Sequence, residues 1–298
     1  MTAQFQTRLN DKFLANALFD ERTETGLDEG QLRRLAPSIF AETKHESRSD
    51  RFVVIPTWDA IQALMKEGFV PVAAKQGGTR IQGKQFFTKH IVRFRHGTAA
   101  MKGNSEMLPE IILRNAADGT SSYRVMSGLF RPICRNGLVS ADVVEDFKIG
   151  HTGNIVDRVI EGTWKVVGES QRVIEQANSW RAVVLDQDER DIFAEAVHTL
   201  RFADSDEHTR QAINPRQLLA PKRPEDQNRW DLWTSFNVLQ ENAIRGGQHG
   251  VVNRRDEETG QNRIRNITVR PLSSIDGDTA LNKALWVLST KFAALKGA

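Results

Sequence analysis

The sequence has almost no cysteine and no long apolar run. Cys134 is the only cysteine among 298 residues, so no disulfide can form within the chain. No apolar stretch approaches the roughly 20 residues that a membrane-spanning helix needs. The first residues, MTAQFQTRLNDKF, lack the apolar core of a signal peptide. These absences exclude a disulfide scaffold, and we expect a cytoplasmic protein that does not contact a membrane.

The motifs of the common cofactor and metal sites are also missing. The chain contains no GxxxxGK[ST] or GxGxxG phosphate-binding loop, no CxxC pair and no HxxxH pair. His90, His96 and His151 do not have the spacing of metal ligands, and a structural role explains them more simply. We therefore expect neither a metal nor a cofactor.

Cys134 has two interpretations, as a reactive thiol or as a structural side chain. Arg131 and Arg135 are close to it in sequence, and their positive charges would lower the pKa of the thiol. His151 would then be the candidate base. Cys134 nevertheless follows the apolar Ile133 in an expected strand, and cysteine is commonly buried. The structural interpretation is favoured, and we predict no catalytic residue.

The stretch from residue 110 to residue 151 organises the expected fold. Asp118-Gly119 and Asn136-Gly137 separate three strand-like runs, and such dipeptides readily adopt the positive backbone dihedral angles of hairpin turns. Three consecutive antiparallel strands are predicted, at about 110–115, 121–134 and 138–149.

Helical periodicity surrounds this meander. Apolar residues at intervals of three or four predict one long amphipathic helix over 154–181. Asp28 is placed to cap an early helix, and Thr57 to cap a helix over 58–67. Three further helices are expected later in the chain, at about 187–201, at 226–244 and before Leu295.

The sequence thus predicts an α+β protein. A mostly antiparallel β-meander sheet is followed by a long helix and by a mainly helical C-terminal third. We expect an α+β core domain over 1–185 and a helical region over 186–298. Whether the two pack as one domain is left open.

Acidic residues are absent from positions 68–105, although the whole chain has a formal net charge of only +3. Within this basic segment, KHIVRFRH alternates as a strand does. His90, Val92 and Phe94 share one face, which we expect to be buried. The other face, with Arg93 and Arg95, is expected to present cations.

A second basic segment, residues 245–270, is predicted to be a long loop or a ragged hairpin. Clustered Lys and Arg bind phosphate backbones, and neighbouring aromatic rings stack on bases. The predicted nucleic-acid contacts are Lys89, Arg93, Arg95, Arg131, Arg135, Arg254, Arg255, Arg263 and Arg265. The alternative, that these cations form a solvated face or pair with carboxylates of the chain, stays open.

An ordered set of motifs resembles a known family. The motifs are RFVVIPTWDAIQALMKEGFVPVAAKQ, KHIVRFRH, NAADGTSS, GLFRPICRNGL, GHTGNIVDRV and FNVLQENAIRGG. Over about 50–295 they resemble the phage/plasmid-like family, known only as a domain of unknown function found on mobile elements. The resemblance implies a mobile-element context and transfers no catalytic residue. A β-meander followed by a long helix is also similar to the core of the single-strand annealing proteins, which bind DNA in a basic groove and assemble into rings.

On these grounds we expect a DNA-binding accessory protein of a phage or plasmid. It would bind single-stranded DNA in recombination, annealing or replication, and it needs no catalytic chemistry. Two other classes remain open: an anti-defence inhibitor that acts by binding a protein, and a nuclease or thiol-dependent enzyme. A homo-oligomer, and a host or element-encoded protein partner, are likewise left open.

Overall fold

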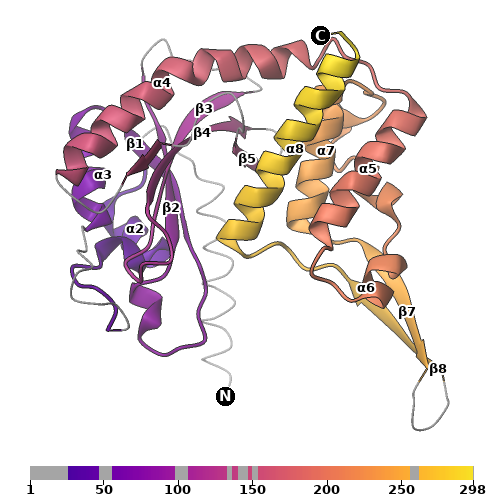
Figure 1. Ribbon diagram of the computed structural model, residues 1–298, viewed down its shortest axis with the longest axis horizontal. Helices are drawn as coiled ribbons and strands as arrows, with labels where there is room; N and C mark the ends of the chain where they lie inside the picture. Colours follow the sequence, from indigo (N-terminus) through magenta and orange to yellow (C-terminus); the bar gives the residue numbers. More distant parts are fainter. Residues whose placement is uncertain are drawn as a thin grey trace. The chain divides into compact units, whose positions relative to one another are not determined.

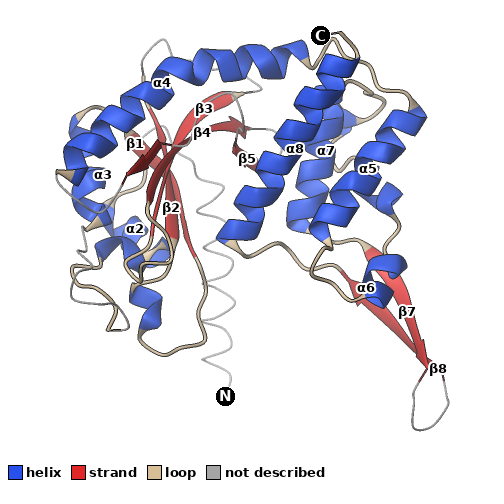
Figure 2. Ribbon diagram, in the orientation of Figure 1, coloured by secondary structure: helices blue, strands red, loops and turns tan. Residues whose placement is uncertain are grey.

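The computed structural model describes residues 26–46, 56–97, 107–132, 136–139, 147–149, 154–255 and 262–297. The chain divides into two compact units, unit 1 over Met1–Ile174 and unit 2 over Glu175–Ala298 (Figure 1). Unit 1 combines a sheet with helices, and unit 2 is mainly helical (Figure 2). The predicted α+β class is confirmed.

Unit 1 is built around a six-stranded antiparallel sheet. Its strands are β1 (Val70–Gln76), β2 (His90–Arg95), β3 (Leu108–Asn115), β4 (Tyr123–Arg131), β5 (Asn136–Val139) and β6 (Phe147–Ile149). Their order is β1-β2-β3-β4-β5, and β6 also pairs with β4. The helical elements are α2 (Glu29–Leu35), the 3-10 turn η1 (Pro37–Phe40), α3 (Thr57–Lys66), the 3-10 turn η2 (Lys84–Phe86) and the long helix α4 (Ile155–Ser179).

The third predicted strand, 138–149, is in fact two strands. β5 pairs with the C-terminal end of β4, and β6 pairs with its N-terminal end. A straight continuation of β5 would bring residue 144 opposite Tyr123, whereas the structure places Ile149 there. The register therefore differs by five residues, which one continuous strand cannot accommodate.

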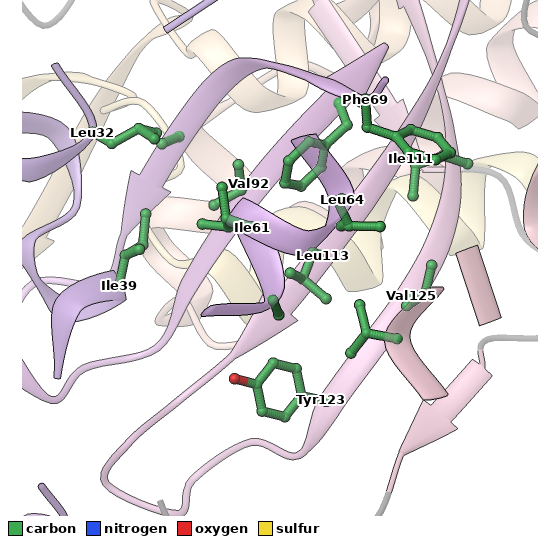
Figure 3. Close-up of a cluster of buried hydrophobic side chains, with 14 of the residues drawn as sticks. Leu32, Ile39, Ile61, Leu64, Phe69, Val92, Ile111, Leu113, Tyr123 and Val125 are labelled. Carbon is green, nitrogen blue, oxygen red and sulfur yellow. The ribbon is translucent and has the colours of Figure 1, made fainter. Parts of the chain in front are cut away.

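One face of the sheet, which we call the core face, packs against the helices. Alternation along β2 turns His90, Val92 and Phe94 to this face, and all three are fully buried, as predicted. Ile61 and Leu64 of α3 belong to the same buried cluster and lie over the strands (Figure 3). The cluster also contains residues of α2 and of the first half of α4, so three helices cover the core face.

The two predicted helix caps have different outcomes. Asp28 caps α2 as predicted: its carboxylate accepts from the Gln31 backbone N–H at 2.7 Å, and the Gln31 side chain accepts from the Asp28 N–H at 2.8 Å. Thr57 does not cap α3, because it is the first helical residue and Pro56 occupies the N-cap position. The Thr57 hydroxyl turns into the protein interior instead.

Unit 2 contains α5 (Gln187–Arg201), α6 (Glu207–Ala212), η4 (Pro215–Leu219), η5 (Pro224–Asp226), α7 (Leu232–Arg245), β7 (His249–Arg255), β8 (Asn262–Thr268) and α8 (Ile275–Leu295). The predicted domain boundary, between 185 and 186, lies at the start of α5. Buried aromatic rings hold the helices together, and the rings of Trp180 and Trp286 are 4.5 Å apart between centroids.

The basic segment 245–270 forms the hairpin of β7 and β8, so the hairpin interpretation is correct. The base of the hairpin is fixed to the helical body. Gln217 donates to the His249 carbonyl at 2.8 Å and accepts from the His249 N–H at 3.0 Å. Gly250 lies so close to α6 that an added Cβ would come within 2.2 Å of the Ala212 carbonyl oxygen, and only glycine fits there.

Candidate nucleic-acid interface

Four basic residues lie in one row across the sheet of unit 1. The register places Lys75 opposite Ile91, Ile91 opposite Arg114, Arg114 opposite Arg124, and Arg124 opposite Lys148. Directly opposite residues share a face of the sheet, and this face is the one that points away from the core face. We call Lys75, Arg114, Arg124 and Lys148 the basic row, and the face that carries it the basic face.

The basic row concentrates charge of one sign. Neighbouring strands are about 4.8 Å apart, so Arg114 and Arg124 bring two cations directly opposite each other. Like charges in this arrangement destabilise a sheet, but they raise the local potential that attracts polyanions. The side chains of Lys75, Arg114 and Arg124 are half-buried, so part of each reaches the surface. Arg114 Nε donates to Ser121 Oγ at 3.2 Å, which orients its guanidinium group.

Arg93 and Arg95 also belong to the basic face, but both pair with a buried carboxylate. Glu110 is 0% exposed and lies 3.2 Å from Arg93 Nη1 and 3.0 Å from Arg95 Nη2. Arg93 is itself only 7% exposed, so the prediction that it faces solvent is wrong. The Arg95 guanidinium lies 4.8 Å from the centre of the Phe130 ring. Internal ion pairing, the alternative that the sequence left open, therefore applies to these two arginines.

Arg131 cannot complete a surface with Arg93 and Arg95. Arg93 pairs opposite Ile112, which pairs opposite Met126, so all three lie on the basic face. Five residues further along β4, alternation puts Arg131 on the core face, where it is 1% exposed. These three arginines therefore do not share one exposed surface.

Two further contacts were predicted in unit 1, Lys89 and Arg135. Lys89 immediately precedes β2 and is half-buried. Arg135 lies outside the described residues, as do Cys134 and His151.

The other predicted contacts lie on the hairpin of unit 2. Arg254 is opposite Arg263, and Val252 is opposite Arg265, so these positions share one face of the hairpin. Arg255 is opposite Asn262 in the same hairpin. The side chains of Arg263 and Arg265 are exposed. The hairpin is thus a second cationic element, in a different unit from the basic row.

Sequence reasoning missed the residues of the basic row. Arg114 is the only cation of β3, and β4 carries Arg124 near its start besides Arg131 at its end, so cations within strand-like runs were the available signal. Alternation alone tells which face each occupies within its own strand. Only the register shows that the two are neighbours and that Lys75 and Lys148 continue the row.

A separate polar cluster is buried between α3, η1 and the sheet. Thr57 Oγ1 lies 2.9 Å from His90 Nε2, 3.0 Å from Asn115 Nδ2 and 3.3 Å from the Tyr123 hydroxyl. Ser38 Oγ lies 2.9 Å from His90 Nδ1. Asn115 and Tyr123 both donate to the Thr57 oxygen, so the Thr57 hydrogen is left for His90 Nε2. We assign the neutral, Nδ1-protonated tautomer to His90 on this basis.

This cluster joins elements and does not form a site for a substrate. The five side chains are at most 2% exposed, so no ligand reaches them from solvent in this structure. Burial lowers the pKa of His90 to about 4 and raises the pKa of Tyr123 above its usual range. His90 is therefore neutral at physiological pH, and the structural role predicted for it agrees with its position.

Acid is expected to destabilise unit 1 through His90. Its pKa is about 4 in the folded protein against 6.5 in an exposed histidine. Between these values the unfolded chain binds a proton that the folded protein does not, so the free energy of unfolding falls as the pH drops. The loss should total about 3 kcal/mol. Urea denaturation across this pH range measures it.

The matched variant for this measurement is His90→Gln. It should be less stable than the wild type at neutral pH but lose less stability on acidification. Burial also lowers the pKa of His198, which acts in the same direction but is present in both proteins. An identical pH dependence in the variant would show that His90 is not the responsible group.

Two other kinds of site are missing from the part of the chain that the structure describes. In those residues, no three His, Cys, Asp or Glu side chains are grouped as metal ligands. No helix among them combines the length and the apolar character needed to cross a membrane.

The fold and the basic row define an α+β protein with a cationic sheet face. The chain belongs to the family described as "Domain of unknown function (DUF932)", whose model matches residues 44–286. The resemblance to a family of unknown function is thereby confirmed.

Two relatives in Escherichia coli (strain K12) are similar over nearly their whole length. The chain is 38% identical to "UPF0380 protein YafZ" over 283 residues, which are 95% of this chain and 97% of that protein. It is 37% identical to "UPF0380 protein YfjQ" over 283 residues, with the same two shares. No solved structure matches the chain.

Proposed function

We propose that this protein binds single-stranded DNA along the basic row. In this proposal it is a cytoplasmic accessory protein of a mobile element, acting in recombination, annealing or replication. The basic row is the observation that carries the proposal. Lys75, Arg114 and Arg124 come from three strands, and the fold brings them into line with Lys148. The hairpin arginines at 254, 255, 263 and 265 would add a second contact.

The geometry of the row suits a flexible polyanion. Five strands, from β1 across to β6, give the row a length of about 19 Å at the usual strand spacing. Cations at four of the five strand positions, with Ile91 at the β2 position, can follow a phosphate backbone, and this type of contact does not depend on base sequence. A single strand adjusts its backbone to such a track more readily than a stiff duplex does. Arg93, buried against Glu110, would support the face rather than touch a phosphate.

Salt dependence tests the proposal most directly. Fluorescence anisotropy with a labelled single-stranded oligonucleotide should show that the logarithm of the association constant falls linearly with the logarithm of the salt concentration. Arg114→Ala combined with Arg124→Ala should reduce that slope by about 1.4, since each single-strand phosphate contact contributes about 0.7. A duplex of the same sequence measures the preference for single strands.

The matched control is Lys165→Ala combined with Arg172→Ala. These α4 side chains are 59% and 68% exposed, and their loss removes the same charge from another surface of unit 1. The control should keep the wild-type slope. Binding that is undetectable at low salt would reject the proposal, and so would an equal change of slope in both double variants.

A further inference from the structure

A pocket with aromatic and arginine walls lies in unit 1, between the turn η2 and the elements α2 and η1 that pack on the core face of the sheet. Its volume is about 540 Å³. Arg33 of α2, Phe40 of η1 and Phe86 of η2 form its principal walls, and Pro37 and residues 41–43 complete the lining. The pocket is therefore built from α2 and η1, which are consecutive in the chain, and from η2, which follows them only after α3 and β1.

The Arg33 guanidinium is held in one orientation. Its Nε and Nη2 both donate to Glu29 Oε1, at 2.9 and 2.8 Å. Its central carbon lies 3.9 Å from the centre of the Phe40 ring, and that ring lies 5.0 Å from the ring of Trp58. The Arg33 side chain is nevertheless 55% exposed. A planar group fixed along one edge and one face, and open to solvent, is a surface on which another planar group can stack.

Phe86 supplies an aromatic surface to the same pocket. It is 50% exposed, although large aromatic side chains contribute most to stability when they are buried. An aromatic ring left open in a pocket wall is typical of ligand sites. The ligand that suits a phenyl ring and a guanidinium plane is itself planar and aromatic, as a nucleobase is.

One side chain connects this pocket to β1, the strand that carries Lys75. Gln76 follows Lys75 in β1; it accepts from the Ser38 N–H of η1 at 3.1 Å and donates to the Gln85 carbonyl of η2 at 3.3 Å. The same residue therefore fixes both turns that form the pocket. β1 is the edge strand in the order of described strands. Gln76 is opposite His90 and therefore lies on the core face, whereas Lys75 lies on the basic face. A nucleic-acid strand that follows the row past Lys75 would reach the pocket by passing round the edge strand β1.

We propose that the pocket holds one unstacked base of the single strand bound along the basic row, stacked against Phe86 and Arg33. This inference rests on the proposed function and adds to it a base contact that phosphate binding does not require. The contact accepts any base, because every base has a π-face.

Two oligomers separate base contacts from phosphate contacts. One is an oligothymidylate, and the other is an abasic oligomer of the same length with the same number of phosphates. Phe86→Ala should weaken binding of the oligothymidylate about tenfold, the size expected for one stacked base. It should leave the affinity for the abasic oligomer and the salt slope unchanged. Arg33→Lys, which keeps the charge and removes the plane, should act in the same direction.

Ile192→Ala in α5 is the control, since Ile192 is an exposed apolar residue of similar exposure, 59%. It should bind both oligomers as the wild type does, and circular dichroism should show that Phe86→Ala keeps its fold. Unchanged oligothymidylate binding by Phe86→Ala would overturn the pocket proposal alone. Equal weakening for both oligomers would also overturn it. If the wild type binds neither oligomer, the proposed function itself has failed, and the pocket proposal with it.

Discussion

Thr57→Val is expected to lower the free energy of unfolding by about 4 kcal/mol, because the Thr57 hydroxyl serves three buried partners. Valine has nearly the same shape but offers no hydrogen bond to His90, Asn115 or Tyr123, which now meet at the Thr57 oxygen. Each buried polar group that loses a partner costs about 1–3 kcal/mol, and the added methyl group recovers only part of this. These groups come from α3, β2, β3 and β4, so the variant should loosen the attachment of α3 to the sheet.

The measurement is urea denaturation of Thr57→Val beside Thr57→Ser. Serine keeps the hydroxyl and loses one buried methyl group, so it should cost only about 1 kcal/mol. Equal losses in the two variants would mean that packing around residue 57 matters and the hydrogen bonds do not. Hydrogen exchange of the α3 amides should rise more in the valine variant than in the serine variant, because local opening becomes easier there.

Glu110→Gln is expected to cost about 4 kcal/mol of stability and, if the proposed function is correct, to strengthen DNA binding. The carboxylate is fully buried and pairs with both Arg93 and Arg95. Removing one member of a buried ion pair leaves a charge in a poorly solvated place, which is strongly unfavourable. The same change makes the basic face more positive, and the association constant for a polyanion should therefore rise.

A double-mutant cycle tests the stability effect. Glu110→Met combined with Arg93→Met removes both buried charges and should be more stable than Glu110→Met alone, since apolar residues often replace a buried pair at little cost. Arg95, whose side chain is 22% exposed, can still reach water in the double variant. If the double variant lost as much stability as Glu110→Met and Arg93→Met together, the two charges would not be coupled. Weaker DNA binding by folded Glu110→Gln would count against the basic face as the contact surface.

Much of the fold followed from local patterns in the sequence. Asp28 and Gln31 form the capping box that their spacing predicts, and the alternation of His90, Val92 and Phe94 correctly identified the buried side of β2. Asp118-Gly119 lies at the turn between β3 and β4 as predicted, and the helical period predicted the long helix α4. These signals succeed because caps, turns and periodicity depend on residues only a few positions apart. Asn136-Gly137, predicted to be a turn, instead forms the start of β5.

The candidate site was less predictable, because charge in the sequence does not show which charges meet. Arg93 was expected to face solvent, yet the register brings Glu110 beside it and buries both. Thr57 was expected to cap the start of a helix, yet its hydroxyl contacts three side chains from β2, β3 and β4. In both cases a partner distant in sequence offered a better interaction than water or the local backbone did.

By itself, the sequence determined the α+β class, the meander, the long helix and the excess of cations in two segments. Only the tertiary structure decided that Lys75, Arg114, Arg124 and Lys148 form one row, that Arg131 lies on the opposite face, and that Arg33 and Phe86 share a pocket. The physical reason is that strand register is set by the hydrogen bonds and packing of the whole sheet. A shift of one residue in a single strand would move its cation to the other face.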